Sequence, residues 1–420
     1  MRFPNTFLAL VLALGVPGIS PHAEEAAAAD QRSALEVRAG MLTQRLLLVD
    51  THIDVPYRLE EKWADVTALT GDGDFDYERA RRGGLNIPFM SIYTPGESEA
   101  EGSAFELANR LIDRVEALAG RLPKRIVTVS SPRAALKARE LGLMGLAMGM
   151  ENGSPIDGKL ENLAFFRDRG ISYVTLAHAL SNHLADSSYD ENRPWGGLSP
   201  FGREVVAEMN RLGIMVDVSH ISDEAFWQVV ELSKVPVIAS HSSARHFTPG
   251  WERNMSDDMI RALAEKNGVI MINFGSSFVT EEARQWYERM SKARKSYLSE
   301  NGFDEHGSEA QLFQQEYRER HPFPYANLDD VVAHFMHVIG LVGVEHVGIG
   351  SDFDGVGDSL PEGLKDVSQY PNLVTKLLEQ GLDDDAIEAI LGGNLLRVWQ
   401  AAADYAEQAA REARRAPAEA

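Results

Sequence analysis

His52 and Asp54 close the apolar stretch "LLLVDTHID" (46–54), and their types and spacing suit a metal ion. Residues two apart in a β-strand point to the same side, so one imidazole and one carboxylate would be directed at a common point. The same pair also suits a plain salt bridge. The pair alone leaves both interpretations open, and the rest of the chain has to decide between them.

Five more titratable residues follow apolar stretches elsewhere in the chain: Glu151, His178, His220, His241 and Asp352. Burial there would destabilise each of them unless it had a partner. Taken singly, each histidine can be a hydrogen-bonded structural residue and each acid can cap a turn or a helix. The chain has only 12 histidines, however, and several of them stand at such positions. Gathered in one place, these imidazoles and carboxylates match the nitrogen and oxygen ligands of zinc, with no sulfur required.

Two metal ions account for the candidate ligands better than one does. The candidates are His52, Asp54, Glu151, His220 and His241. A single zinc ion with an open position needs three protein ligands. Five ligands suit two ions that share the Glu151 carboxylate. A hydroxide between the ions would be the nucleophile, because both ions lower the pKa of its parent water.

Asp352 and His178 remain for the proton transfers and the substrate. Asp352 is expected to accept the proton of the hydroxide and pass it to a leaving amine. His178 is expected to polarise a carbonyl group or to stabilise the oxyanion.

The elements that position these residues are short apolar stretches bounded by Gly, Pro, Asn or Asp, which predict β-strands. Most are continuously apolar, as in a parallel sheet covered on both faces. Helical patterns alternate with them, at 104–122, 199–213, 222–233 and 256–268. An open doubly wound sheet is the alternative, but the count of eight favours an α/β fold of the (β/α)8 TIM-barrel type, as in metal-dependent hydrolases. The eight predicted strands are 45–54, 85–94, 143–153, 171–179, 213–222, 235–243, 268–276 and 346–355.

One catalytic domain is expected over residues 40–400, since no repeat or linker divides it. Residues 278–326 form a long polar insertion between the seventh and eighth strands. It is expected to be helical, either as a solvated hairpin or as a lid or subunit contact. Residues 401–420 form an Ala-rich helical tail that is expected to fray.

Residues 1–23 resemble a secretory signal, with Arg2 before an apolar stretch too short to span a membrane stably. An uncleaved anchor is the alternative. The chain has no cysteine, which excludes disulfides and thiolate metal sites. Its formal net charge of −22 argues against a nucleic acid partner. A bacterial periplasmic location is expected.

Many motifs, in order, resemble the membrane (renal-type) dipeptidases, peptidase family M19, and a bacterial secreted member in particular. The resemblance covers about residues 45–400, apart from the insertion. It is carried by "DTHIDVP", "GMENG", "TLAHALSNHLADSS", "DVSHIS", "ASHSSAR", "RNMSDD", "GSDFDGV", "LPEGLKDVSQYPNLVTKLLEQG" and "GGNLLRVW".

The resemblance implies a site with two zinc ions. His52 and Asp54 would bind one ion, His220 and His241 the other, and Glu151 both. It also implies a homodimer without a stable membrane anchor, since the chain lacks cysteine and a C-terminal apolar tail.

The resemblance further implies that His178 and Arg253 bind substrate, and that Asp352 is the acid/base that meets the substrate amine. A guanidinium suits the C-terminal carboxylate of a peptide, and Arg245 is a nearby competitor for that role. Animal members tend to carry a Tyr where this chain has Gly275, which is expected to widen the carboxylate pocket.

The predicted function is therefore that of a zinc-dependent dipeptidase acting on free dipeptides, including those with a C-terminal D-residue. A metal-dependent deacylase of N-acyl amino acids or a lactonase is the alternative enzyme, since the same attack serves all three. The alternative outside enzymes is a metal-stabilised periplasmic peptide-binding protein.

Overall fold

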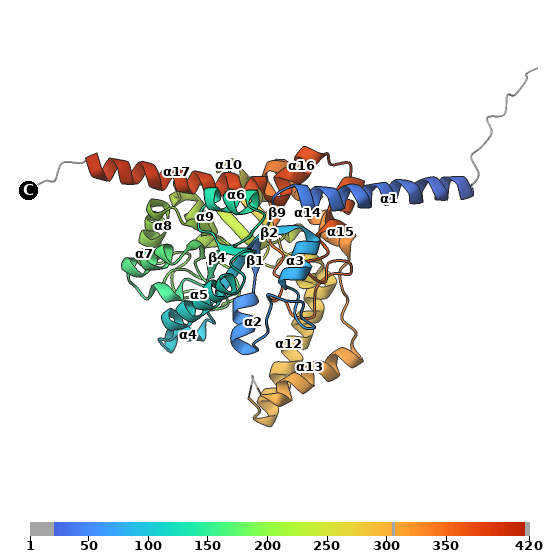
Figure 1. The fold of residues 1–420 in the computed structure, drawn as a ribbon. Helices are drawn as coiled ribbons and strands as arrows, with labels where there is room; N and C mark the ends of the chain where they lie inside the picture. The colour runs from blue at the N-terminus through green and yellow to red at the C-terminus, as the bar shows by residue number, and fades with distance from the viewer. Residues whose placement is uncertain (1–20, 305–306, 416–420) are drawn as a thin grey trace, which may run out of the picture.

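Eight parallel β-strands form a nearly closed barrel surrounded by helices in the computed structural model, which describes residues 21–304 and 307–415 (Figure 1). The strand order is β1-β2-β4-β5-β6-β7-β8-β9. The strands are β1 (Leu48–Ile53), β2 (Leu85–Tyr93), β4 (Met144–Glu151), β5 (Ile171–Thr175), β6 (Met215–Asp217), β7 (Ile238–Ser242), β8 (Val269–Ile272) and β9 (Val347–Ile349).

The first and last strands meet at their carboxyl ends. Ile53 forms a parallel bridge with Phe353, and the Asp54 N–H donates to the Phe353 carbonyl at 2.9 Å. The Asp352 N–H donates to the His52 carbonyl at 3.1 Å. These bonds join the segment that carries His52 and Asp54 to the segment that carries Asp352.

Each of the eight predicted strands contains a barrel strand, so the predicted fold is confirmed. The prediction missed a ninth strand, β3 (Ile126–Thr128), which pairs only with β4 and lies outside the barrel order. Three residues are too few to give a readable apolar pattern, because a strand signal needs about four to eight.

The four helical patterns correspond to α5, α8, α9 and α10 to within three residues at either end. Ser222 and Ser256 cap α9 and α10 by accepting from the N–H groups of Ala225 and Met259. The α-helices are α1 (Pro21–Arg45), α2 (Val55–Glu61), α3 (Tyr77–Gly83), α4 (Glu97–Ala100), α5 (Ala104–Arg121), α6 (Pro132–Glu140), α7 (Leu160–Asp168), α8 (Pro200–Leu212), α9 (Asp223–Leu232), α10 (Asp257–Glu265), α11 (Ser276–Val279), α12 (Glu281–Asn301), α13 (Ser308–Arg320), α14 (Leu328–Val342), α15 (Tyr370–Glu379), α16 (Asp384–Glu388) and α17 (Asn394–Arg415). Short helical turns are η1 (Ser154–Ile156), η2 (Arg245–Phe247), η3 (Val344–His346) and η4 (Ala389–Gly393).

Two apolar layers hold the barrel together. The larger lies between the strands and the surrounding helices. The smaller includes Phe89 and Tyr173 from the strands and Trp399 from α17. Phe89 stacks on Tyr173 with ring centroids 5.7 Å apart and packs against Trp399 at 5.2 Å. The Tyr173 hydroxyl contacts His52, so this group of aromatic rings helps to hold one of the predicted metal ligands in place.

The insertion contains α12 and α13, which lie at the opposite end of the molecule from α1 and α17 (Figure 1). The insertion has a small apolar core of its own, made by Ala283, Trp286, Met290 and Phe323. It is therefore packed rather than simply solvated.

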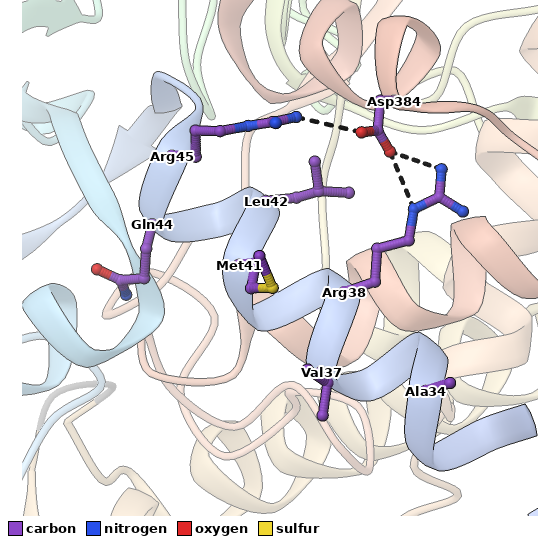
Figure 2. A pocket seen from close by; sticks show the side chains of 8 residues that line it. All are labelled: Ala34, Val37, Arg38, Met41, Leu42, Gln44, Arg45 and Asp384. Atoms are coloured by element: carbon purple, nitrogen blue, oxygen red, sulfur yellow. Dashed lines mark hydrogen bonds and ion pairs between the residues drawn. The ribbon is translucent and has the colours of Figure 1, made fainter. Parts of the chain in front are cut away.

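Helix α1 carries a pocket of about 640 Å³ on its outer side (Figure 2). The charged residues that line it are paired with one another, since Arg38 and Arg45 both donate to the Asp384 carboxylate. Val37 and Met41 of the same helix are exposed. This pocket has no catalytic constellation, unlike the one described below.

The two ends of the chain are described in part. Residues 1–20 of the expected signal and residues 416–420 of the expected tail lie outside the described residues. Helix α17 is continuous across residue 400, and Val398, Trp399 and Ala402 are buried. Among residues 21–304 and 307–415, no helix is long and apolar enough to cross a membrane.

Candidate active site

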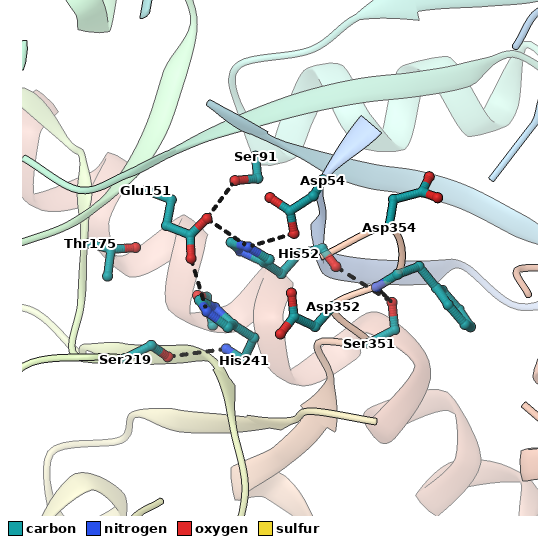
Figure 3. Close-up of polar contacts among 12 residues, drawn as sticks. His52, Asp54, Ser91, Glu151, Thr175, Ser219, His241, Ser351, Asp352 and Asp354 are labelled. Carbon is teal, nitrogen blue, oxygen red and sulfur yellow. Dashed lines mark hydrogen bonds and ion pairs between the residues drawn. The ribbon is translucent and has the colours of Figure 1, made fainter. Parts of the chain in front are cut away.

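The Glu151 carboxylate lies close to all three predicted imidazole ligands, and Figure 3 shows it beside His52 and His241. Its Oε2 is 3.3 Å from His52 Nε2, at the end of β1. Its Oε1 is 3.1 Å from His220 Nε2 and 3.3 Å from His241 Nε2. Asp54 Oδ2 is 3.3 Å from His52 Nε2. All five predicted metal ligands thus converge, because strand ends that are far apart in sequence meet at one mouth of the barrel.

His178 and Asp352 lie at the edges of this cluster. His178 Nε2 is 3.5 Å from Glu151 Oε1, and the ring lies against Tyr93 with centroids 4.7 Å apart. Ligand atoms of His52, Asp54 and Asp352 also lie within 4.8 Å of one another. Both residues line the pocket over the cluster, as residues that touch substrate must.

Residues behind the cluster orient two of the imidazoles. The Tyr173 hydroxyl donates to the Thr51 carbonyl at 2.9 Å, so it accepts from His52 Nδ1 at 2.8 Å. Ser240 donates to Asp217 at 2.6 Å and so accepts from His241 Nδ1 at 2.7 Å. Each bond fixes the proton on Nδ1 and leaves Nε2 with its lone pair toward Glu151, which is the tautomer that binds metal.

The donor set fits metal ions. Every donor is a buried imidazole nitrogen or carboxylate oxygen, and His52 Nε2 has no hydrogen-bond partner. Burial and the neighbouring Arg253 lower the pKa values of His220 and His241 well below their ordinary value. Burial would raise the pKa of Glu151, but the surrounding histidines bring it well below its usual range. Neutral imidazoles and an ionised carboxylate are the forms that bind metal.

The pKa of His52 is raised, whereas those of His220 and His241 are lowered. Burial alone would lower its pKa, but Tyr173, Glu151 and Asp54 raise it well above its ordinary value. The carboxylates therefore favour a positive charge at this point. A bound cation supplies such a charge without a proton on His52.

Asp352 is a buried acid with a raised pKa. Burial and the Asp54 carboxylate raise the pKa of Asp352 to about 8. Asn273 donates to Asp352 Oδ2 at 2.7 Å and orients it. The backbone is also strained here, with φ values of 63° at Asp352 and 71° at His220. Such left-handed conformations in residues other than glycine cluster at functional sites.

Arg253 is buried against the cluster, with Nη1 donating to Ser242 Oγ at 2.7 Å and Nη2 to the His241 carbonyl at 2.7 Å. Its Nε has no partner. The competitor Arg245 instead forms a two-pronged ion pair with Asp223, at 2.6 and 2.7 Å. The guanidinium of Arg245 is therefore held in a structural ion pair, whereas that of Arg253 lies against the histidine cluster.

The widening of the carboxylate pocket at Gly275 stays a prediction, but the space directly beside this glycine is filled. A Cβ atom there would lie 2.8 Å from Val356 Cγ1 and 3.0 Å from Phe278 Cδ2. Those side chains already occupy the space, and the Phe278 ring lies 5.0 Å from the Arg253 guanidinium carbon.

Sequence reasoning missed the residues that orient the others: Tyr173, Asp217, Ser240 and Asn273. No site residue was predicted at the ends of β2 and β8. Asn273 directly follows β8, and Ser91 in β2 donates to Glu151 Oε2 at 3.0 Å. A polar residue at the end of an otherwise apolar strand was the signal that could have identified Asn273.

The pocket over the cluster has a volume of about 1120 Å³. Its floor is formed by the strand-end residues, including Glu151, His178, His220 and Asp352. Its outer wall is formed by side chains of α12 and α13. The insertion therefore borders the candidate active site rather than projecting away from it.

Comparison with known proteins places this chain among peptidases. The family described as membrane dipeptidase (peptidase family M19) matches residues 36–413. An uncharacterized dipeptidase of Schizosaccharomyces pombe is 32% identical over 386 residues, which cover 88% of this chain and 84% of that protein. Dipeptidase aclJ of Aspergillus oryzae is 32% identical over 333 residues, covering 78% of this chain and 69% of that protein.

Solved structures agree in fold. The probable dipeptidase PvdM of Pseudomonas aeruginosa has a TM-score of 0.77 at 25% identity, covering 89% of this chain and 99% of that chain. A metallopeptidase of Rhodobacter sphaeroides, solved with a phosphinate mimic of the dipeptide L-Ala-D-Ala, has a TM-score of 0.70 at 24% identity, covering 85% and 99%.

Proposed function

Because this chain belongs to the membrane dipeptidases, peptidase family M19, and is thus a metal-dependent hydrolase of peptide bonds, we propose that it cleaves free dipeptides with zinc, including those with a C-terminal D-residue. The observation that carries the proposal is the convergence of three imidazoles on the Glu151 carboxylate beside the acid Asp352.

Two zinc ions are proposed per chain, with Glu151 as the shared ligand. His52 and Asp54 would hold one ion, and His220 and His241 the other. This division is supported by His52 Nε2, which lies 3.3 Å from both Asp54 Oδ2 and Glu151 Oε2, and by His220 and His241, which lie 3.1 and 3.3 Å from Glu151 Oε1. When bound, the ions supply an activated water at neutral pH and polarise the substrate carbonyl.

The chain's own residues then orient the dipeptide and move protons. Asp352, held by Asn273, is proposed to bind the substrate amine and to carry a proton to the leaving amine. His178 is proposed to donate to the carbonyl oxygen as negative charge develops on it. Arg253 is proposed to bind the C-terminal carboxylate, which its unpartnered Nε supports.

The test compares Gly-D-Phe with its N-acetylated twin on zinc-loaded protein. We expect cleavage of the free dipeptide alone, because a buried acid that binds the amine leaves an acetyl group without a partner. Cleavage of the acetylated compound instead would identify a deacylase. Binding without cleavage of either compound would identify a peptide-binding protein.

Export to the periplasm and a homodimer are proposed on the sequence signal and the family resemblance, respectively. N-terminal sequencing of protein from the periplasmic fraction tests the first, with cleavage expected after Ala23 or within residues 26–29. Light scattering of the purified chain tests the second.

A further inference from the structure

We propose that α12 and α13 form a second subsite in the pocket, which binds a long, uncharged and hydrogen-bonding side chain of the dipeptide substrate. This inference rests on the proposed function. It extends that function from the peptide bond to the class of side chain that the enzyme prefers.

Size is the first argument. The pocket of about 1120 Å³ exceeds the roughly 300–1,000 Å³ that sites for drug-sized ligands occupy. A dipeptide with small side chains is much smaller than such a ligand. It would fill the region between Arg253 and Asp352 and leave the space along the insertion to water. That space therefore has room for a further part of the substrate.

Rigidity is the second argument, because a subsite needs walls that are formed before the substrate arrives. Trp286 of α12 packs edge-on against Phe323 with ring centroids 5.0 Å apart. Arg318 of α13 lies over both rings, at 5.4 and 4.9 Å from their centroids. These contacts tie the two helices to the segment that follows them.

The wall is also joined to the loop that carries Asp352. Arg318 donates to Asp358 Oδ2 at 2.9 Å and to the Asp358 carbonyl at 2.7 Å. The Tyr325 hydroxyl donates to the same carboxylate at 2.7 Å. Asp358 lies six residues after Asp352 and lines the same pocket. The insertion is thus held at a fixed position over the site.

Charge is the third argument. The charged lining residues of α12 and α13 are paired, since Arg284 binds Glu281 and Glu288 and Arg318 binds Asp358. Of these residues, Arg284, Glu288, Arg318 and Asp358 line the pocket, so two positive and two negative charges balance along the wall and leave little to attract a charged group.

The uncharged lining residues of the wall include Tyr287 on α12 and Gln311, Gln314 and Gln315 on α13. The glutamines are spaced by three and four residues, so they share one face of the helix. Each amide both donates and accepts hydrogen bonds. Such a face matches an amide or another neutral polar group better than an ion or a hydrocarbon.

Aromatic rings connect this face to the floor. Tyr189 lies near Trp251 with ring centroids 6.2 Å apart, and Trp251 contacts Phe278 at 5.1 Å. All three line the pocket. An extended side chain would pass these rings with its apolar stem and place its polar end against the glutamines.

The experiment compares four dipeptides with free amines: Gly-D-Ala, Nε-acetyl-Lys-D-Ala, Gly-D-(Nε-acetyl)Lys and the unacetylated Lys-D-Ala. We expect one of the acetyl-lysine dipeptides to exceed Gly-D-Ala in kcat/KM by about tenfold, the worth of one or two hydrogen bonds. Which one does so identifies the end of the dipeptide that faces the wall.

The variant Gln311→Ala/Gln314→Ala should remove that preference and leave kcat/KM for Gly-D-Ala unchanged. Gln285→Ala is the matched control, since Gln285 is on α12, donates to Glu281 and does not line the pocket. An unchanged preference in the double variant, or a preference for free lysine, would overturn the subsite. Failure to cleave any of the four dipeptides would overturn the proposed function instead.

Discussion

At the floor of the pocket, imidazole nitrogens from four strand ends lie within 3.5 Å of the single Glu151 carboxylate, whereas the charged side chains of α12 and α13 that line the outer wall form ion pairs with neighbouring residues. His52 Nε2 lies 3.3 Å from two carboxylates and still has no hydrogen bond. The Arg318 guanidinium, by contrast, forms an ion pair with Asp358 and lies over the rings of Trp286 and Phe323.

This difference suggests that the floor carries out the reaction and that the wall selects among substrates. Titratable groups that are buried close together favour a bound cation and perturb one another's pKa values, as is common at functional sites. Paired groups at the surface give shape and neutral hydrogen bonding. Changes at the floor should therefore lower turnover of every dipeptide, while changes at the wall should alter only the preference among dipeptides.

The largest effect is expected from Glu151→Gln. An amide cannot serve as the shared anionic ligand, so we expect kcat to fall by about 10³-fold or more on all substrates. Elemental analysis of the purified variant should show loss of bound metal. Glu288→Gln on the wall is the control, and it should retain both metal and turnover of Gly-D-Ala. Full metal content in Glu151→Gln would contradict the shared-ligand assignment.

Asp352→Asn should follow, with a loss of about 10²–10⁴-fold in kcat, the usual worth of a proton-transfer group. Metal content should stay at the level of the unaltered protein, because Asp352 is not among the five proposed ligands. This combination distinguishes the acid/base from the ligands. Activity unchanged in Asp352→Asn would remove the proposed proton path and leave the metal site intact.

Tyr173→Phe is expected to weaken metal binding by about 10- to 100-fold, the usual cost of removing a group that orients a ligand. The substitution deletes the hydroxyl that accepts from His52 Nδ1 and keeps the ring stacked on Phe89. Competition with a chelator measures the change. Turnover at saturating zinc should recover, and failure to recover would assign the hydroxyl a role beyond positioning His52.

Arg318→Met tests the wall and should change kcat/KM for Gly-D-Ala by about twofold or less. It removes the contacts to Asp358, Trp286 and Phe323 together. We expect faster proteolysis within residues 281–320 and a reduced preference for the acetyl-lysine dipeptide. A large loss on Gly-D-Ala would mean that the wall also positions the catalytic groups.

The barrel strands could be predicted because each is a short apolar stretch of the sequence. The candidate ligands could be predicted because each stands at the end of such a stretch and is of a type that binds metal. His220 and His241 follow this rule directly. Tyr173 and Ser240 do not, because they lie within β-strands and differ from core residues only by a hydroxyl whose partner belongs to another part of the chain. Their role depends on register between strands, which a single sequence does not specify.

The pocket wall could not be predicted for a related reason. The polar insertion indicated helices, but where they lie depends on the contact between Arg318 and Asp358, 40 residues apart. The surroundings of Gly275 could not be predicted for the same reason. Absence of a side chain predicts space only if nothing else fills it, and Phe278 and Val356 do so.

His334 is a buried histidine that lies outside the pocket floor. Its substitution is not expected to change turnover at neutral pH. It is buried in α14, where its Nδ1 accepts from the Ala244 N–H at 3.0 Å and its Nε2 donates to the Val279 carbonyl at 3.0 Å. Both nitrogens are satisfied in the neutral form. Burial, with His337 and His246 nearby, lowers the pKa of His334 to about 4.

Because the unfolded chain binds this proton near pH 6.5 and the folded chain does not, acid favours unfolding. The contribution of neutral His334 is complete above pH 6.5 and falls by roughly 3 kcal/mol as the pH drops to about 4. Urea unfolding at several pH values should show a shallower dependence over this range in His334→Asn, whereas the exposed His321→Asn should keep it. An equal dependence of the free energy of unfolding on pH in both variants would mean that other buried groups dominate the response to acid. The hydrogen-bonded His334 would then make no special contribution to stability.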